Sequence, residues 1–412
     1  MTVTPPQTAS YYEAADTEWE AAFLAYRAAQ ARLAYAGAFL ALNAWSQIIK
    51  PTRFAGSLSR WLDYVIRIIR VFRTRQRRLA QTYYQYARAL DTRETFGKPI
   101  DSSSPTLGNY RNAFLDQLQD VALLDQKVPS DWDDTDGMDE VRRELQSILD
   151  DLDEDSTQRE QNFKDIDLDS AIQKFLDNWE APDNDRVNVR DLKWPDRDAD
   201  NADKVHRDHF RKVAEDLWRE QQDELDRQEA LEDEEDDDTT SRRQSVADKL
   251  EAASQRAGNK VAGRVMTATT NAADQVTNWA MDRDERVYGV ARGTGPHPCA
   301  LCAIAASQGF VYKSVSSAMT TRSGGRFTRY HENCQCYPIV RWTPTQALPQ
   351  STLKWRNIYN AAKAEGGDTF NNFRRRIHAE TASKVNARKR LYYRQNKNRI
   401  NARRRAQRRR AA

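Results

Sequence analysis

Apolar side chains recur at alternating spacings of four and three residues along the first fifty positions. The recurring positions are Trp19, Phe23, Tyr26, Leu33 and Leu40, with Gln30 and Gly37 in the intervening places. This spacing puts them on one face of an α-helix, and the many alanines suit close helix packing. We therefore expect a bundle helix from Ser10 to about Lys50, with Pro51 and Gly56 ending the pattern.

A second helix is predicted from Ser57 to about Leu90, because its apolar residues again follow the helical repeat. Five of its arginines recur at nearly the same repeat and therefore share one broad face: Arg60, Arg67, Arg70, Arg73 and Arg77. Such a face is either solvated or docks on nucleic acid or on an acidic protein surface. The stretch from Gly97 to Tyr110 contains Gly, Pro and Ser and predicts a linker.

The middle of the chain is acidic, and its clearest predicted helix runs from Asp203 to Leu231. The block LEDEEDDDTT that closes it should repel itself and stay extended or disordered. Another long helix is predicted from Ser245, and the string GTGP at residues 293–296 ends it. Small apolar residues form a stripe along this helix that suits tight packing: Leu250, Ala253, Ala257, Val261, Val265 and Ala268.

The pattern predicts a mostly α protein with one small α+β domain. We expect a helical N-terminal bundle over residues 1–110 and an acidic, partly disordered helical region over residues 111–240. A Cys- and His-containing domain with its long leading helix should occupy residues 241–345, and a basic helical tail residues 346–412.

Composition agrees with several small bundles rather than one large core. Of the 412 residues, 39% are hydrophobic and 30% are charged. The start lacks a basic segment followed by an apolar core, and the most apolar run, Leu33 to Trp45, is shorter than the ~18–20 residues of a membrane span. We therefore expect a soluble protein of a reducing cytosol with no membrane partner, whose thiols stay reduced or bind metal.

The four cysteines of the chain lie in two close pairs within one short stretch. A Cys-x-x-Cys turn brings two sulfurs to one tetrahedral ion, and a Cys-x-Cys strand points both side chains to one face. A nearby histidine offers a fifth candidate ligand for four positions. We therefore predict a structural zinc site drawn from Cys299, Cys302, His331, Cys334 and Cys336.

The alternative to zinc is a set of buried thiols in a metal-free α/β core, with His331 hydrogen-bonded nearby. Between the pairs, Gly309 to Tyr312 is predicted to be a strand and Arg322 to Arg326 a hairpin turn. A thioredoxin-type redox role is disfavoured, because no strand is predicted to precede Cys299.

This order of features resembles the domain of phage minor head proteins of the Mu F type, especially the versions from tailed phages of actinobacteria. The similar part runs roughly from Ala252 to Trp342 and includes Gly309 to Tyr312 and the His-x-x-Cys-x-Cys segment that starts at His331. Many relatives have an arginine before the glycine and a proline between the histidine and the cysteine. Here those places hold Gln308 and the pair Glu332-Asn333, and neither departure removes a candidate ligand.

The resemblance implies a low-copy structural protein of a tailed-phage virion, in the capsid interior near the portal. Such a protein is assembled in the bacterial host cytoplasm, with the portal protein, the major capsid protein or both as its partners. The string from Arg75 to Thr92 is also similar to the leading region of these phage proteins, less specifically. The resemblance implies no enzymatic activity.

The end of the chain is densely basic, with Tyr392 and Tyr393 interleaved and no acidic residue after Glu380. A helix there would be positive nearly all round and therefore unsuited to a core. Because phosphate binding through counterion release needs such charge density, we predict non-specific contact with packaged double-stranded DNA. The predicted contacts are Arg374, Arg375, Arg376, Arg388, Lys389, Arg390, Arg394, Lys397, Arg399, Arg403, Arg404, Arg405, Arg408, Arg409 and Arg410. A solvated helix and a clamp on the acidic middle are the alternatives.

Two other functions compete with a structural one. A capsid maturation protease would need a nucleophile near His297 or His331, with an orienting partner. The serines in range are Ser314, Ser316, Ser317 and Ser323, and no nucleophile elbow or recognised spacing supports them. A zinc-stabilised regulator that binds nucleic acid is the third possibility. The sequence favours the structural, non-enzymatic virion protein.

Overall fold

The computed structural model shows a mostly α protein with a small α+β part, as the sequence predicts. It describes residues 9–48, 54–97, 105–122, 194, 202–232, 239–294, 298, 300–319, 336–344 and 348–379. The helices are α1 (Ala9–Ile48), α2 (Phe54–Thr92), α3 (Leu107–Ala122), α6 (Ala202–Glu232), α7 (Thr239–Met281), α8 (Ala300–Ser307), α9 (Val315–Met319) and α10 (Gln350–Ala364), followed by a helix over residues 369–379. The strands are β1 (Gly289–Gly293) and β2 (Tyr337–Arg341).

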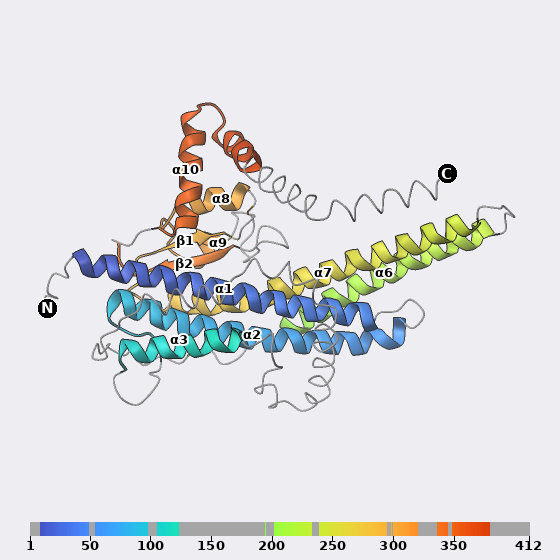
Figure 1. Ribbon diagram of the computed structural model, residues 1–412, viewed down its shortest axis with the longest axis horizontal. Helices are drawn as coiled ribbons and strands as arrows, with labels where there is room; N and C mark the ends of the chain where they lie inside the picture. Colours follow the sequence, from blue (N-terminus) through green and yellow to red (C-terminus); the bar gives the residue numbers. More distant parts are fainter. Residues whose placement is uncertain are drawn as a thin grey trace, which may run out of the picture.

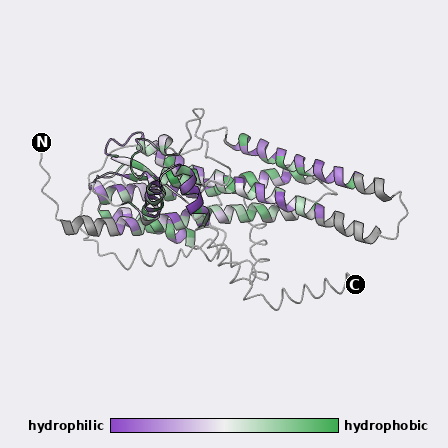
Figure 2. Ribbon diagram, turned by 90° about the horizontal axis from the view of Figure 1, so that it is seen from above, coloured by the Kyte–Doolittle hydropathy of each residue, from purple (hydrophilic) through white to green (hydrophobic). Residues whose placement is uncertain are grey.

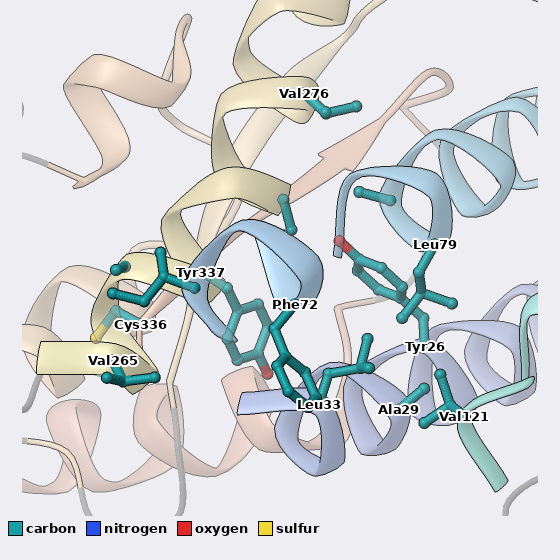
Figure 3. Close-up of a cluster of buried hydrophobic side chains, with 14 of the residues drawn as sticks. Tyr26, Ala29, Leu33, Phe72, Leu79, Val121, Val265, Val276, Cys336 and Tyr337 are labelled. Atoms are coloured by element: carbon teal, nitrogen blue, oxygen red, sulfur yellow. The ribbon is translucent and has the colours of Figure 1, made fainter. Parts of the chain in front are cut away.

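Helices α1, α2 and α7 lie side by side and form the bundle, with α3 packed against α2 (Figure 1). The close-up in Figure 3 shows Leu33 of α1, Phe72 of α2 and Val265 of α7 in one buried cluster. The predicted stripe of small residues on α7 is confirmed, because its members from Ala253 to Ala268 are buried. An added Cβ at Gly258 would lie 2.8 Å from Leu42 Cδ1, so the two helices approach closely there.

The predicted apolar seam of α1 is buried as expected, including its one polar member. Gln30 is 1% exposed, donates a hydrogen bond from Nε2 to the Tyr26 hydroxyl at 2.7 Å, and accepts one at its backbone carbonyl from Gln76 Nε2 at 2.7 Å. Because buried amides need partners, these bonds make a glutamine tolerable inside the bundle.

Helices α6 and α7 form a long antiparallel hairpin that extends beyond the ends of α1 and α2 (Figure 1). We call the projecting part the arm. Many of its coloured residues are hydrophilic (Figure 2), and ion pairs join its helices, Lys249 to Glu224 at 2.7 Å and Arg256 to Glu220 at 2.5 Å. Exposed pairs of this kind contribute little free energy, so the arm depends on packing at its base.

Strands β1 and β2 pair antiparallel, with Val290 opposite Val340, and Tyr312 bridges to Val290 on the other side of β1. The predicted extent of the long helix is wrong at its end. Helix α7 stops at Met281, and residues 289–293, predicted to be helical, form β1. The predicted break at Gly56 is also wrong, because α2 begins at Phe54.

The sheet packs against α1 through two contacts between cations and aromatic rings. The guanidinium of Arg27 lies 3.4 Å from the ring centroid of Tyr337, and that of Arg341 lies 3.4 Å from the ring centroid of Trp19. One hydrophobic cluster therefore continues from the bundle into the sheet. Within the described residues, no helix combines the length and the hydrophobicity needed to cross a lipid bilayer.

Candidate site around the cysteines and the base of the tail

Two of the five predicted zinc ligands lie in the described part of the chain. Cys302 is on α8 and Cys336 directly precedes β2, and their exposed fractions are 0% and 2%. Both belong to the main hydrophobic cluster, and Figure 3 shows Cys336 beside Val265. Cys299, His331 and Cys334 lie outside the described residues. Among those described, no three Cys, His, Asp or Glu side chains form a metal-binding group.

Arg292 is a buried neighbour of Cys302 that the sequence analysis did not select. It lies in β1, is 0% exposed, and its Nη1 donates to Cys302 Sγ at 3.5 Å while its Nε donates to the Ala318 carbonyl at 2.6 Å. A guanidinium beside a sulfur favours the thiolate, the form that binds zinc. Burial in the hydrophobic cluster acts in the opposite direction, so the surroundings of Cys302 are consistent both with a metal ligand and with a buried thiol that accepts a hydrogen bond. In the sequence, the one feature that could have pointed to Arg292 is its position as a charged residue inside the otherwise uncharged string GVARG.

Gly309, which ends the Cys-x-x-Cys segment, closes α8 in a left-handed conformation with φ of 72°. Its N–H donates to the Ala306 carbonyl at 3.1 Å, as expected for a glycine after a helix C-terminus. Arg356 of α10 donates to the carbonyls of Ser307 at 3.1 Å and Gln308 at 2.9 Å. A Cβ at Gly309 would lie 2.4 Å from Arg356 Nη2, so a side chain there would push the guanidinium away from the carbonyls of Ser307 and Gln308.

The prediction of a strand from Gly309 to Tyr312 is wrong. These residues form a turn, and Tyr312 pairs with Val290 in a single bridge. The reason given against a redox role also fails, because β1 precedes Cys299 in the chain. The predicted hairpin turn at residues 322–326 lies outside the described part.

Ser314 and Ser317, two serines considered as nucleophiles, have a structural role in the described geometry. The N–H of Ser317 donates to Ser314 Oγ at 3.0 Å, and the N–H of Ser314 donates to Ser317 Oγ at 3.2 Å. This reciprocal pair caps the first turn of α9. Ser323, His297 and His331 lie outside the described residues, and so does the side chain of Ser316.

A buried carboxylate joins the bundle to the start and the end of the sheet. Asp284, between α7 and β1, accepts hydrogen bonds from Arg88 Nε at 2.7 Å, Tyr84 hydroxyl at 3.0 Å and Trp342 Nε1 at 2.9 Å. The Arg88–Asp284 ion pair has both side chains at 0% exposure. Burial pushes the pKa of Asp284 upward, but the hydrogen bonds and charge of Arg88, with the Trp342 bond, hold it below its ordinary value.

The base of the tail has a small hydrophobic cluster of its own. Phe373 and Ile377, four residues apart on the helix over 369–379, are 0% and 5% exposed and pack with Trp355 of α10 and with alanines of α8. The expectation that a helix in the tail would be positive nearly all round is therefore wrong for this segment. One face of the helix is apolar, and the adjacent arginines lie outside it.

Three of the predicted DNA contacts, Arg374, Arg375 and Arg376, are exposed on this helix. Arg376 pairs with Glu365 at 2.5 Å, and Arg375 lies 3.6 Å from the same carboxylate. The other predicted contacts lie outside the described residues: Arg388, Lys389, Arg390, Arg394, Lys397, Arg399, Arg403, Arg404, Arg405, Arg408, Arg409 and Arg410.

The fold thus defines a helical protein in which a small cysteine-containing module is fixed to a bundle with a projecting arm. Residues 200–362 match the model of a protein family described as VG15 protein. The matched part runs from the start of α6 into α10, and it indicates a phage virion-associated family for that region. Searches of curated proteins and of solved structures found no match.

Proposed function

We propose that this protein is a structural component of a tailed-phage head, of the Mu F minor head type, that acts in head assembly. It would lie on the inner side of the capsid near the portal, after assembly in the bacterial host cytoplasm. Its partners would be the portal protein, the major capsid protein or both. The observation that carries the proposal is the family match over residues 200–362, which includes α6, α7 and the sheet.

The architecture supports a role in holding other parts at fixed positions. Helix α7 has 43 residues and therefore spans about 65 Å, from the tip of the arm to the turn before β1. The buried Asp284 network fixes the sheet to α2, and the cation–aromatic contacts fix it to α1. A contact made at the arm would thus be held at a defined distance from the cysteine-containing module. This role needs no catalytic chemistry.

Analysis of purified particles tests the main proposal. Mass spectrometry of mature heads should find the protein, and a phage with the gene deleted should give few or defective heads until the gene is supplied in trans. Normal heads without the protein would refute the proposal. Incubation with the precursor of the major capsid protein tests the protease alternative, because cleavage that depends on this chain would make it an enzyme.

We also propose that the basic tail contacts packaged double-stranded DNA without sequence preference. The support is the charge density after Glu380 and the exposure of Arg374, Arg375 and Arg376. DNA affinity should be compared over a range of salt concentrations for the full chain and for a chain ending at Ala379, which keeps the buried Ile377. The truncated chain should bind more weakly and with a shallower salt dependence. Equal slopes would refute DNA binding by the tail.

A matched control for this truncation keeps its length. Every Lys and Arg after Ala379 is replaced by Gln, so that charge is removed without shortening the chain. Loss of the salt dependence in both variants would assign binding to charge rather than to length.

Structural zinc is the cofactor that we propose for the cysteine pairs, with Cys302 in its thiolate form beside Arg292. When bound, the metal would stabilise the module and take no part in a reaction. Elemental analysis of the purified protein should find about one zinc per chain. The variant Cys302→Ser should lose it, whereas Ser307→Ala, at a serine on the same helix, should retain it. Metal-free protein with unchanged stability would favour the buried-thiol alternative.

A further inference from the structure

A cluster of basic side chains is enclosed where the first turns of α6 pack against α2 and α7. Two exposed ion pairs join α6 to α2 here, Arg70 to Asp203 at 2.5 Å and Arg207 to Asp63 at 2.7 Å. The predicted basic face of α2 is therefore partly covered by the chain's own α6. We define the cationic cluster as Arg70, Arg73 and Arg77 of α2, His206 of α6 and Arg264 of α7.

Part of the cluster is withdrawn from water. Arg73 is 3% exposed and His206 is 8% exposed, while Arg70 remains open to solvent on its outer side. The ring of His206 stacks on Phe210 at 6.4 Å between centroids, which fixes its orientation. The cluster therefore has a buried inner end, at Arg73 and His206, and an exposed outer end, at Arg70.

The charged groups that act on His206 are mostly positive, with Asp203 as the exception. Burial, followed by the charges of Arg264 and Arg73, lowers the pKa of His206 to about 4, and Asp203 opposes this only in part. Burial and the charge of Arg73 likewise lower the pKa of Arg77 to about 10. Burial disfavours any further charge here, whereas the charges of Arg264 and Arg73, which also lower these pKa values, would disfavour a positive charge and favour a negative one.

His206 Nδ1 and Arg264 Nε are buried nitrogen atoms of the cluster, and neither has a hydrogen-bond partner among the described residues. Such atoms are rare in folded proteins, because leaving them unpaired costs free energy. The N-terminus of α6, which starts at Ala202, adds its own positive partial charge. Arg264 Nε carries a proton and is a donor, and His206 Nδ1 donates in the tautomer that protonates it, so a negative ligand rich in acceptor oxygens would satisfy both the charge and these donors.

We propose that the cationic cluster binds a phosphate group, either as inorganic phosphate or as part of a nucleic-acid backbone. Guanidinium groups match the geometry of phosphate oxygens, and helix N-termini bind the same group. The site is distinct from the tail and does not depend on the proposed role in the head.

Thermal unfolding of the full chain tests the site with inorganic phosphate against chloride at matched ionic strength. Phosphate should raise the Tm of the unmodified protein and of Arg256→Gln, an exposed arginine of the same helix α7. In Arg264→Gln that rise should be clearly smaller, with phosphate binding by calorimetry weakened about tenfold, as expected for one lost charge-assisted contact. The proposal would be overturned if phosphate did not raise the Tm of the unmodified protein more than chloride does. It would also be overturned if phosphate raised the Tm of Arg264→Gln and of Arg256→Gln equally.

The source of the phosphate is resolved with the full-length protein whose basic tail is neutralised by Gln. If a short DNA duplex displaces inorganic phosphate from this protein, the site takes a nucleic-acid phosphate. If only the free ion binds, the site takes inorganic phosphate. A further readout is the imidazole of His206 by NMR, because phosphate should raise its pKa in the unmodified protein. In Arg264→Gln the loss of the cation should itself raise this pKa, and phosphate should then cause no further rise.

Discussion

Asp284 illustrates how one residue can determine whether two parts of this protein stay together. Its carboxylate is shared by Arg88, 196 positions away in the sequence, and by Trp342, 58 positions away. A buried ion pair gains little over an apolar pair of the same volume, but removing one partner leaves the other charge buried and uncompensated. When Asp284 is replaced, most of the loss in the free energy of unfolding should therefore come from the buried charge of Arg88, which is left without a partner.

The substitution Asp284→Asn tests this argument. It keeps the side-chain volume but removes the negative charge opposite Arg88, so the free energy of unfolding should fall by about 3–5 kcal/mol, measured by urea denaturation. The neighbouring exposed Asp282 supplies the control, because Asp282→Asn should change stability by less than about 0.5 kcal/mol. Similar effects of the two substitutions would contradict a stabilising role for the buried pair.

Glu18 should make stability depend on pH in the opposite direction from an ordinary carboxylate. It accepts a hydrogen bond from Tyr86, and burial raises its pKa to about 7, although that bond and the charge of Arg111 oppose the rise. Since the folded pKa is above the unfolded value of 4.5, the contribution of Glu18 is fully present below pH 4.5 and is lost as the pH rises through 7.

Glu18→Gln should therefore stabilise the protein at pH 8, by on the order of 1–3 kcal/mol, and should have little effect at pH 5. Urea denaturation at the two pH values measures this difference. Asp116→Asn, at an exposed position of α3, is the control and should not reproduce it. A Glu18→Gln effect of the same size at both pH values would rule out titration of Glu18 as the cause.

At the scale of elements, long helices could be predicted from the sequence and short segments could not. The seam of α1 and the stripe of α7 each span several turns, so their periodicity is unambiguous. In contrast, β1 has five residues, all buried, and shows no alternation that would separate it from the preceding helix. Helix α3 begins inside the string predicted to be a linker, because Thr106 and Asn109 form its start through hydrogen bonds that composition does not reveal.

Close packing of α7 on α1 predicts a steep cost for side chains at Gly258. The Cβ of a valine there would lie 2.8 Å from Leu42 Cδ1 and 3.1 Å from Trp45 Cδ1, so these side chains would have to shift within the packed interface. We expect Gly258→Val to lower the free energy of unfolding by about 1–3 kcal/mol. Asn259→Val, the same β-branched change at the adjacent exposed position, should cost much less in the same urea titration.

At the scale of the whole molecule, only those residues of the candidate site that belong to short sequence motifs could be predicted. The cysteine pairs and Gly309 were visible as short patterns. Arg292 and Arg356 were not, because their roles depend on contacts with α8, and the contact of Arg356 with Ser307 joins positions 49 residues apart. The amphipathic start of the tail was missed because its two apolar residues, Phe373 and Ile377, are surrounded in sequence by arginine.

The separate small core at the base of the tail implies that this part of the protein unfolds at a lower free-energy cost than the bundle does. Trp355, Phe373 and Ile377 lie outside the main hydrophobic cluster, so the helix over residues 369–379 can open while the bundle stays folded. Amide hydrogen exchange should therefore be faster in that helix than in α2, and Trp355→Ala should accelerate it there alone. Equal acceleration in α2 would show that the two cores unfold together. Once opened and extended, those residues would lengthen the reach of the basic tail by roughly 20 Å.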